Sequence, residues 1–299
     1  MGFVIWDFSL DLTFVAKLTN TKCPENSDVL MFHKRYTDMP NESDKSALST
    51  PAELAELTSR YINQFCRQAA FPSTVNMRID RHRNDLENSD VQFRPVQAEL
   101  DNRQLTIHLY EEPLMGISPL SLQGLLDMEL ARCQLELEPA LYRVNFNKDI
   151  RPLFYVSGSG LNLVRHLVAH LEAGLKNLIA AQLVMEIGHR EPLLYFCYHK
   201  IRPSMAEKEN YQRLVPYDWI RALFVANKLK EFLPVTFLAQ RDSVAELESH
   251  WWNCHAHILP EDKRILKTLF DLSNQNPVKH FSATLVELFK LMKSQFLIR

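Results

Sequence analysis

The strongest constraint on the fold is the helical periodicity of the chain from Pro216 onward. Apolar residues recur there at three- and four-residue spacing, and prolines separate successive segments, which is typical of packed helices. The expected helices are 219–232, 244–257, 261–272 and 278–297, punctuated by Pro234, Pro260 and Pro277. A helix gains most of its stability from burying such a stripe. We therefore expect these side chains to be largely buried: Val225, Leu229, Phe232, Leu247, Trp251, Leu266, Phe270, Leu285, Phe289 and Met292.

Strand patterns occur only in the earlier part of the chain. Residues 1–18 are rich in β-branched and aromatic side chains, which favours N-terminal strands, and residues 19–49 form a polar, turn-rich excursion. Residues 75–79 favour a further strand. The stretches 95–100 and 105–110 flank a short polar segment, so they predict a β-hairpin.

Helix signals are also present before Pro216. Thr50 and Ser118 are each followed by proline, a pairing of cap and first helical residue that predicts a helix start. A long helix is predicted from residue 157 to Gly188, whose glycine is a plausible C-terminal cap. Strands with a few helices come first and helices alone follow, so the predicted fold is α+β and predominantly helical.

This order of patterns also predicts the domain organisation. We expect an α+β domain over 1–203 and a helical C-terminal region over 204–299 that packs on it.

Composition excludes several functional classes. The chain has only 7 glycines among 299 residues, well below the usual ~7%, and this disfavours a nucleotide-binding α/β enzyme because phosphate loops need glycine. Its 34 Lys and Arg residues face 36 Asp and Glu residues, so the global field that attracts nucleic acid is missing. Five scattered cysteines without a C-x-x-C pair, no signal peptide and no long apolar run predict a cytoplasmic protein with no membrane partner.

A strand followed by a helix carries the most informative motif. The strand is Gln104–Tyr110, and the helix contains Leu-Leu-Asp-Met-Glu-Leu-Ala-Arg at 125–132. This pair resembles the strand and active-site helix of zincin metallopeptidases, which carry H-E-x-x-H where this chain has Met128 to Arg132. In that family two imidazoles one turn apart bind Zn²⁺ and the glutamate polarises the metal-bound water. Here only Glu129 keeps its place.

A second match lies in the segment 176–188. It looks like the later helix of gluzincin-type proteins, with an A-x-x-L-x-x-x-x-G pattern, and Asn177 stands near the place of their third ligand, a glutamate. The resemblance covers about residues 100–200 and implies a zincin-like strand-helix-helix core. It further implies a degenerate site that holds no metal or cofactor, formed by Met128, Glu129, Arg132 and Asn177. The implied function is that of a non-catalytic pseudoenzyme that binds a peptide or protein partner.

Glu129 itself predicts an ion pair. It projects from the apolar stripe of its helix, where a lone carboxylate costs several kcal/mol to desolvate. A basic partner is therefore expected, and the candidates are Arg132, Arg143, Arg151 and Arg165.

Two alternative functions remain open on the residues. The first is a metal-dependent hydrolase, because His166 and His170 have ligand spacing and Glu246, His250, Cys254 and His257 share a predicted helical face. Packed or surface histidines are the ordinary explanation of both groups. The second alternative is a helical adaptor or regulatory protein unrelated to zincins.

Overall fold

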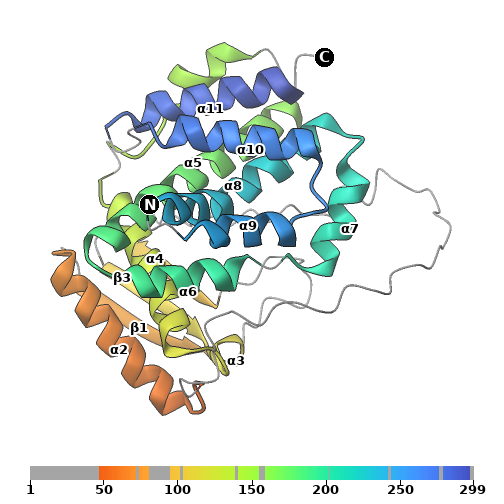
Figure 1. Ribbon diagram of the computed structural model, residues 1–299. Helices are drawn as coiled ribbons and strands as arrows, with labels where there is room; N and C mark the ends of the chain where they lie inside the picture. Colours follow the sequence, from red (N-terminus) through yellow and green to blue (C-terminus); the bar gives the residue numbers. More distant parts are fainter. Residues whose placement is uncertain are drawn as a thin grey trace, which may run out of the picture.

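The computed structural model describes residues 47–71, 74–80, 95–101, 104–138, 141–154, 159–201, 203–241, 244–275 and 279–296. Within this part the fold is α+β and predominantly helical, as predicted, with a small sheet at one end of a helical body (Figure 1). The strands expected in 1–18, and the polar excursion up to residue 46, lie outside the described residues.

The sheet has three strands in the order β1-β3-β2. β1 (Thr74–Asp80) runs parallel to β3 (Gln104–Tyr110), and β2 (Val96–Asp101) pairs antiparallel with β3. The predicted hairpin is thus confirmed. Leu105, Ile107 and Leu109 of β3 are fully buried, because alternate side chains of a strand share one face and this face is covered by helices.

The helices next to the sheet begin where their caps predict. α2 (Pro51–Gln68) starts after Thr50, whose hydroxyl accepts the Glu53 N–H at 3.2 Å. The short α3 (Glu111–Leu114) follows β3. α4 (Pro119–Glu136) starts after Ser118, whose hydroxyl accepts the Ser121 N–H at 3.1 Å. Such caps satisfy backbone donors that a helix leaves unpaired.

α4 is the central helix beside the sheet, and it contacts α2, β2, α5 and α6. It is buried on most of its circumference, so its apolar residues do not form a single stripe. Gly124 permits a close contact with α6: a Cβ at this position would lie 2.1 Å from the Pro192 carbonyl oxygen. α6 spans Arg190–Lys200.

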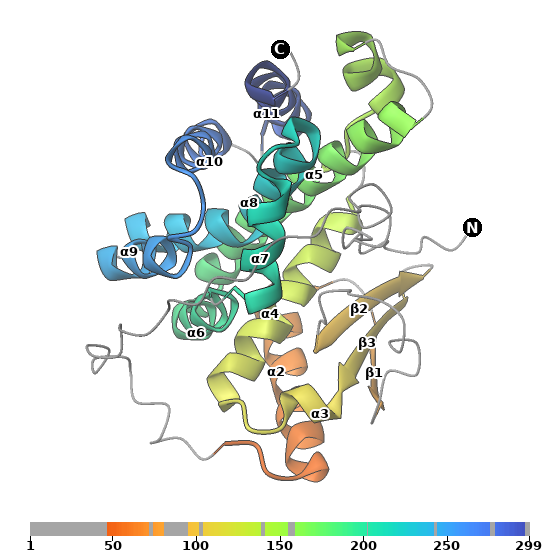
Figure 2. The same cartoon turned by 90° about the vertical axis from the view of Figure 1, so that its right-hand side faces the viewer.

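The helical body is organised around two long helices. α5 (Ser159–Glu186) packs along α8 (Asp218–Arg241), and α9, α10 and α11 lie on the side of α8 away from the sheet (Figure 2). The remaining bounds are η2 Phe146–Ile150, η3 Arg151–Leu153, α7 Met205–Leu214, α9 Ala245–Cys254, α10 Pro260–Ser273 and α11 Phe281–Phe296. All the apolar side chains predicted to be buried in the C-terminal helices are buried.

The buried apolar side chains form one cluster that extends from Leu48 to Phe296. It runs across residue 203, where α5 and α6 on one side meet α8 on the other. The division into 1–203 and 204–299 stays a prediction.

The predicted break at Pro234 is wrong, because α8 continues through this residue to Arg241. Proline lacks the N–H that would bond to the carbonyl of Lys230, four residues earlier. The side chain of Asn177 on α5 supplies the missing donor: its Nδ2 donates to the Lys230 carbonyl at 2.9 Å. The helix can therefore pass through proline without leaving a buried acceptor unpaired.

Candidate functional site

A small cavity, called here the polar pocket, lies between α4, α5, α6 and α8 at the start of β2. Its volume is about 50 Å³. Three residues predicted from the sequence, Glu129, Arg132 and Asn177, line it together. The full lining is Pro95, Val96, Leu125, Glu129, Arg132, Asn177, Phe196, Cys197, Lys200, Asn227, Lys230, Glu231 and Val235. The fourth predicted residue, Met128, does not line it and is fully buried in the core.

Glu129 and Arg132 form the α4 wall of the pocket as an ion pair. Their Oε1 and Nη2 atoms lie 2.8 Å apart, and the Arg132 Nε donates to the Met128 carbonyl at 3.3 Å. The predicted basic partner of Glu129 is thus found three residues along the same helix, a spacing that brings side chains together. The Glu129 carboxylate thus already has a charged partner on its own helix.

Asn177 forms the α5 wall. Its amide nitrogen donates to the Lys230 carbonyl, and this hydrogen bond links α5 to α8 at the pocket. As an amide, the Asn177 side chain carries no negative charge.

The α8 wall carries residues that the sequence reasoning missed: Asn227, Lys230 and Glu231. Behind them, the Nζ of Lys228 lies 2.9 Å from Glu231 and 2.8 Å from Glu207 of α7. Burial acts to lower the pKa of Lys228, but the two carboxylates outweigh it and leave the pKa raised. Burial likewise opposes ionisation of Glu231, yet Lys228 holds its pKa below the ordinary value. The Glu231 carboxylate is therefore held in place, and Lys228 balances its charge.

A sequence signal for this wall did exist. The sequence of α8 is apolar on nearly all sides, which predicts burial, so a charged residue within it must be paired or must face a cavity.

The His166 and His170 pair lies on α5, beside the pocket residues. His170 is buried, and its pKa lies well below the ordinary value because of burial and the nearby cation Lys230. Burial also lowers the pKa of His166. Both imidazoles are thus held neutral at neutral pH. No group of three or more His, Cys, Asp or Glu side chains within the described ranges is arranged to hold a metal ion.

The cluster over 246–257 is divided by the end of α9. His250 Nε2 and Cys254 Sγ lie 3.7 Å apart on the helix. The predicted common face with His257 is wrong, because α9 ends at Cys254 and His255 caps it, with Nδ1 donating to the Trp251 carbonyl at 2.9 Å. The His257 ring contacts Tyr211 and His255 instead.

A buried pair that the sequence reasoning missed joins α4 to the start of α6. His189 Nδ1 donates to Asp127 Oδ2 at 2.8 Å, and both residues are nearly inaccessible. The side-chain amide of Gln64 on α2 donates to His189 Nε2 at 3.1 Å. Burial raises the pKa of Asp127, and the His189 hydrogen bond opposes this rise. These contacts hold three helices together.

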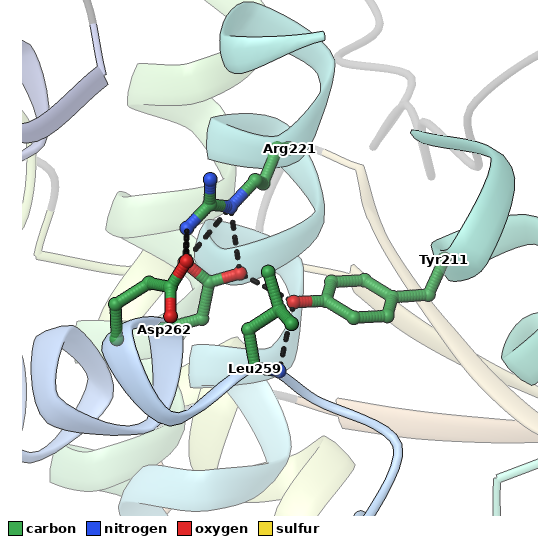
Figure 3. Close-up of polar contacts among 5 residues, drawn as sticks. Tyr211, Arg221, Leu259 and Asp262 are labelled. Carbon is green, nitrogen blue, oxygen red and sulfur yellow. Dashed lines mark hydrogen bonds and ion pairs between the residues drawn. The ribbon is translucent and has the colours of Figure 1, made fainter. Parts of the chain in front are cut away.

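A second buried polar cluster joins α7, α8 and α10 (Figure 3). The Tyr211 hydroxyl donates to Asp262 at 2.5 Å and accepts the Leu259 N–H at 3.0 Å. Arg221 Nε and Nη2 donate to the same carboxylate at 2.7 to 3.0 Å. Burial and the Asp262 hydrogen bond raise the pKa of Tyr211. With every group in this cluster paired, we assign it a structural role.

A comparison with known protein families, with curated proteins and with solved structures finds no match to this chain. Among the helices of the described residues, none has the length and apolar character needed to span a bilayer.

Proposed function

We propose that this protein is a non-catalytic, zincin-like binding protein that takes up an extended segment of a peptide or protein partner along β2, beside the polar pocket. The observation that carries the proposal is the position of the pocket: Pro95 and Val96, at the start of an edge strand, form one of its walls. Glu129, Arg132 and Asn177, which the zincin resemblance groups together, form further walls.

The arrangement of β2, α4 and α5 also supports the proposal. β2 contacts α4, and α5 also contacts α4. The strand that the resemblance places before the active-site helix is Gln104–Tyr110, which is β3; it pairs with β2 and leads through α3 to α4.

β2 can accept another strand on the edge that faces away from β3. Within the described residues no strand pairs with its outer edge. The Tyr110 N–H donates to the Pro95 carbonyl. The backbone N–H and C=O groups of the odd-numbered residues of β2 therefore point to β3, and those of the even-numbered residues point away from it. Val96, Ala98 and Leu100 therefore direct their N–H and C=O groups to the open side. An extended peptide can pair with these groups by strand addition.

The residues at the positions of the H-E-x-x-H motif favour binding without catalysis. Where zincins have two neutral imidazoles, this chain has the thioether of Met128 and the guanidinium of Arg132. Neither group can replace an imidazole as a ligand of Zn²⁺. Glu129 is engaged by Arg132. We expect the purified protein to bind peptides without cleaving them, with or without a chelator present. Peptide cleavage that a chelator abolishes would favour the metal-dependent hydrolase instead.

The binding test uses a fluorescein-labelled heptapeptide of alternating threonine and valine. Its binding to the protein is measured by fluorescence anisotropy. Two further versions carry N-methyl groups on alternate amides, offset by one residue. A strand-paired peptide directs only alternate N–H groups to its partner. We expect one methylated version to lose binding and the other to keep it. Equal binding of both methylated versions, or no binding of the parent peptide, would contradict the proposal and favour an adaptor that binds through its helices.

A further inference from the structure

We propose that the polar pocket selects a segment with an acidic side chain, whose carboxylate enters the pocket while the backbone pairs with β2. This inference rests on the proposed function and adds a specificity to it. The occupant is an extended peptide with an aspartate or glutamate opposite the first residues of β2, because Pro95 and Val96 border the cavity.

The charges around the pocket favour an anion. Three cations line it, Arg132, Lys200 and Lys230, against two carboxylates, Glu129 and Glu231. The lining therefore carries a net charge of +1 (three minus two). Both carboxylates have cations of their own within the protein: Arg132 lies at 2.8 Å from Glu129, and Lys228 at 2.9 Å from Glu231. A cationic ligand would thus compete with protein cations at both carboxylates.

The cations of the lining also act on neighbouring groups. Lys230 lowers the pKa of the buried His170, in addition to the larger effect of burial. Lys200 contributes to the lowered pKa of Glu231, behind the larger effect of Lys228. Charges act over longer range in a partly buried site than in open water, because the effective dielectric constant is lower.

The size of the cavity fits one small polar group. Its volume of about 50 Å³ corresponds to only a few water molecules at ~10–15 Å³ each. A carboxylate with its methylene group matches this space, whereas a whole residue does not. The apolar residues Leu125, Phe196 and Val235 in the lining suit the methylene, and the Asn227 amide can donate to a carboxylate oxygen.

The test compares three labelled heptapeptides of the threonine and valine series that differ only in a central Glu, Gln or Lys. We expect the Glu peptide to bind about tenfold more tightly than the Gln peptide, and the Lys peptide to bind most weakly. The Lys200→Gln and Lys230→Gln variants should bring the Glu-to-Gln ratio towards one. Lys290→Gln is the matched control, because it removes the same charge from the exposed face of α11, where Lys290 pairs with Glu287.

The outcomes separate the two proposals. Equal binding of the Glu and Gln peptides, or preference for Lys, would overturn the acidic specificity and leave strand addition intact. If none of the three binds, both proposals fail. If either lysine variant does not fold, the test is the salt dependence of the Glu-to-Gln affinity ratio of the wild-type protein. This preference for Glu must decrease as the salt concentration is raised, because salt screens charge. A preference that salt leaves unchanged would contradict the inference.

Discussion

At the scale of single residues, the sequence predicts one contact of the site, between Glu129 and Arg132, and does not predict another, between Asn177 and Lys230. Glu129 and Arg132 are three positions apart, and helix geometry brings such side chains together. The bond from Asn177 to Lys230 joins residues on different helices, 53 positions apart. The sequence nevertheless indicates that the Lys230 carbonyl needs another donor, because Pro234 lacks the N–H that would bond to it in a helix. Only the packing of α5 against α8 identifies which side chain supplies the replacement.

The Asn177 contact predicts a double-mutant cycle. Asn177→Ala leaves the Lys230 carbonyl unpaired and should lower the free energy of unfolding by about 1 to 3 kcal/mol. In the Pro234→Ala background the helix regains its own N–H donor, so the same change should cost less. Denaturant unfolding of all four proteins measures the difference. Equal costs in both backgrounds would show that Asn177 does not compensate for the proline.

His255 predicts a pH dependence of stability. Burial, reinforced by Lys228, lowers its pKa to about 4 in the folded protein, against about 6.5 in an unfolded chain. The unfolded state then binds more protons between these values, so stability is complete above pH 6.5 and falls as the pH drops towards 4. The difference corresponds to about 3 kcal/mol.

The His255→Asn variant should therefore lose less stability between pH 6.5 and pH 4 than the wild type, as measured by urea unfolding. Asparagine keeps a donor for the Trp251 carbonyl. His280→Gln, at an exposed position, is the control and should follow the wild type. A variant whose stability declines as steeply as that of the wild type would refute the assignment to His255.

At the scale of elements, caps and apolar stripes predict most helices, because both are local in sequence. Thr50 and Ser118 mark the starts of α2 and α4. Two predicted helix ends are wrong, one because of a tertiary contact and one because of a local cap. α8 passes through Pro234 because α5 supplies a donor, and α9 stops at Cys254, before the predicted end of its helix.

The junction of α7, α8 and α10 gives a prediction at this scale. Tyr211→Phe removes a hydroxyl that serves both Asp262 and the Leu259 N–H at the start of α10. Loss of these bonds should lower the free energy of unfolding by about 1 to 3 kcal/mol. Tyr217→Phe, at an exposed position, should change it little. Thermal unfolding of both variants makes the comparison, and equal stability would remove the structural role given to the Tyr211 hydroxyl.

At the scale of the whole molecule, composition and pattern order predict the α+β, predominantly helical class. They do not predict the polar pocket, which needs four helices and a strand to meet in space. The zincin resemblance brought together Glu129, Arg132 and Asn177, which do line the pocket. It could not identify Lys200, Lys230 or Glu231, because those residues lie outside its motifs, and their position follows from the packing of α6 and α8.

The most direct test of peptide binding along β2 is amide hydrogen exchange by NMR, with and without the Glu heptapeptide. The amides of Val96, Ala98 and Leu100 face the open edge, whereas those of Gln97 and Glu99 bond to β3. We predict that the peptide slows exchange at the outward amides and leaves α11 unchanged, because strand addition gives those N–H groups acceptors. Unchanged exchange along β2 while the peptide is bound would contradict the account.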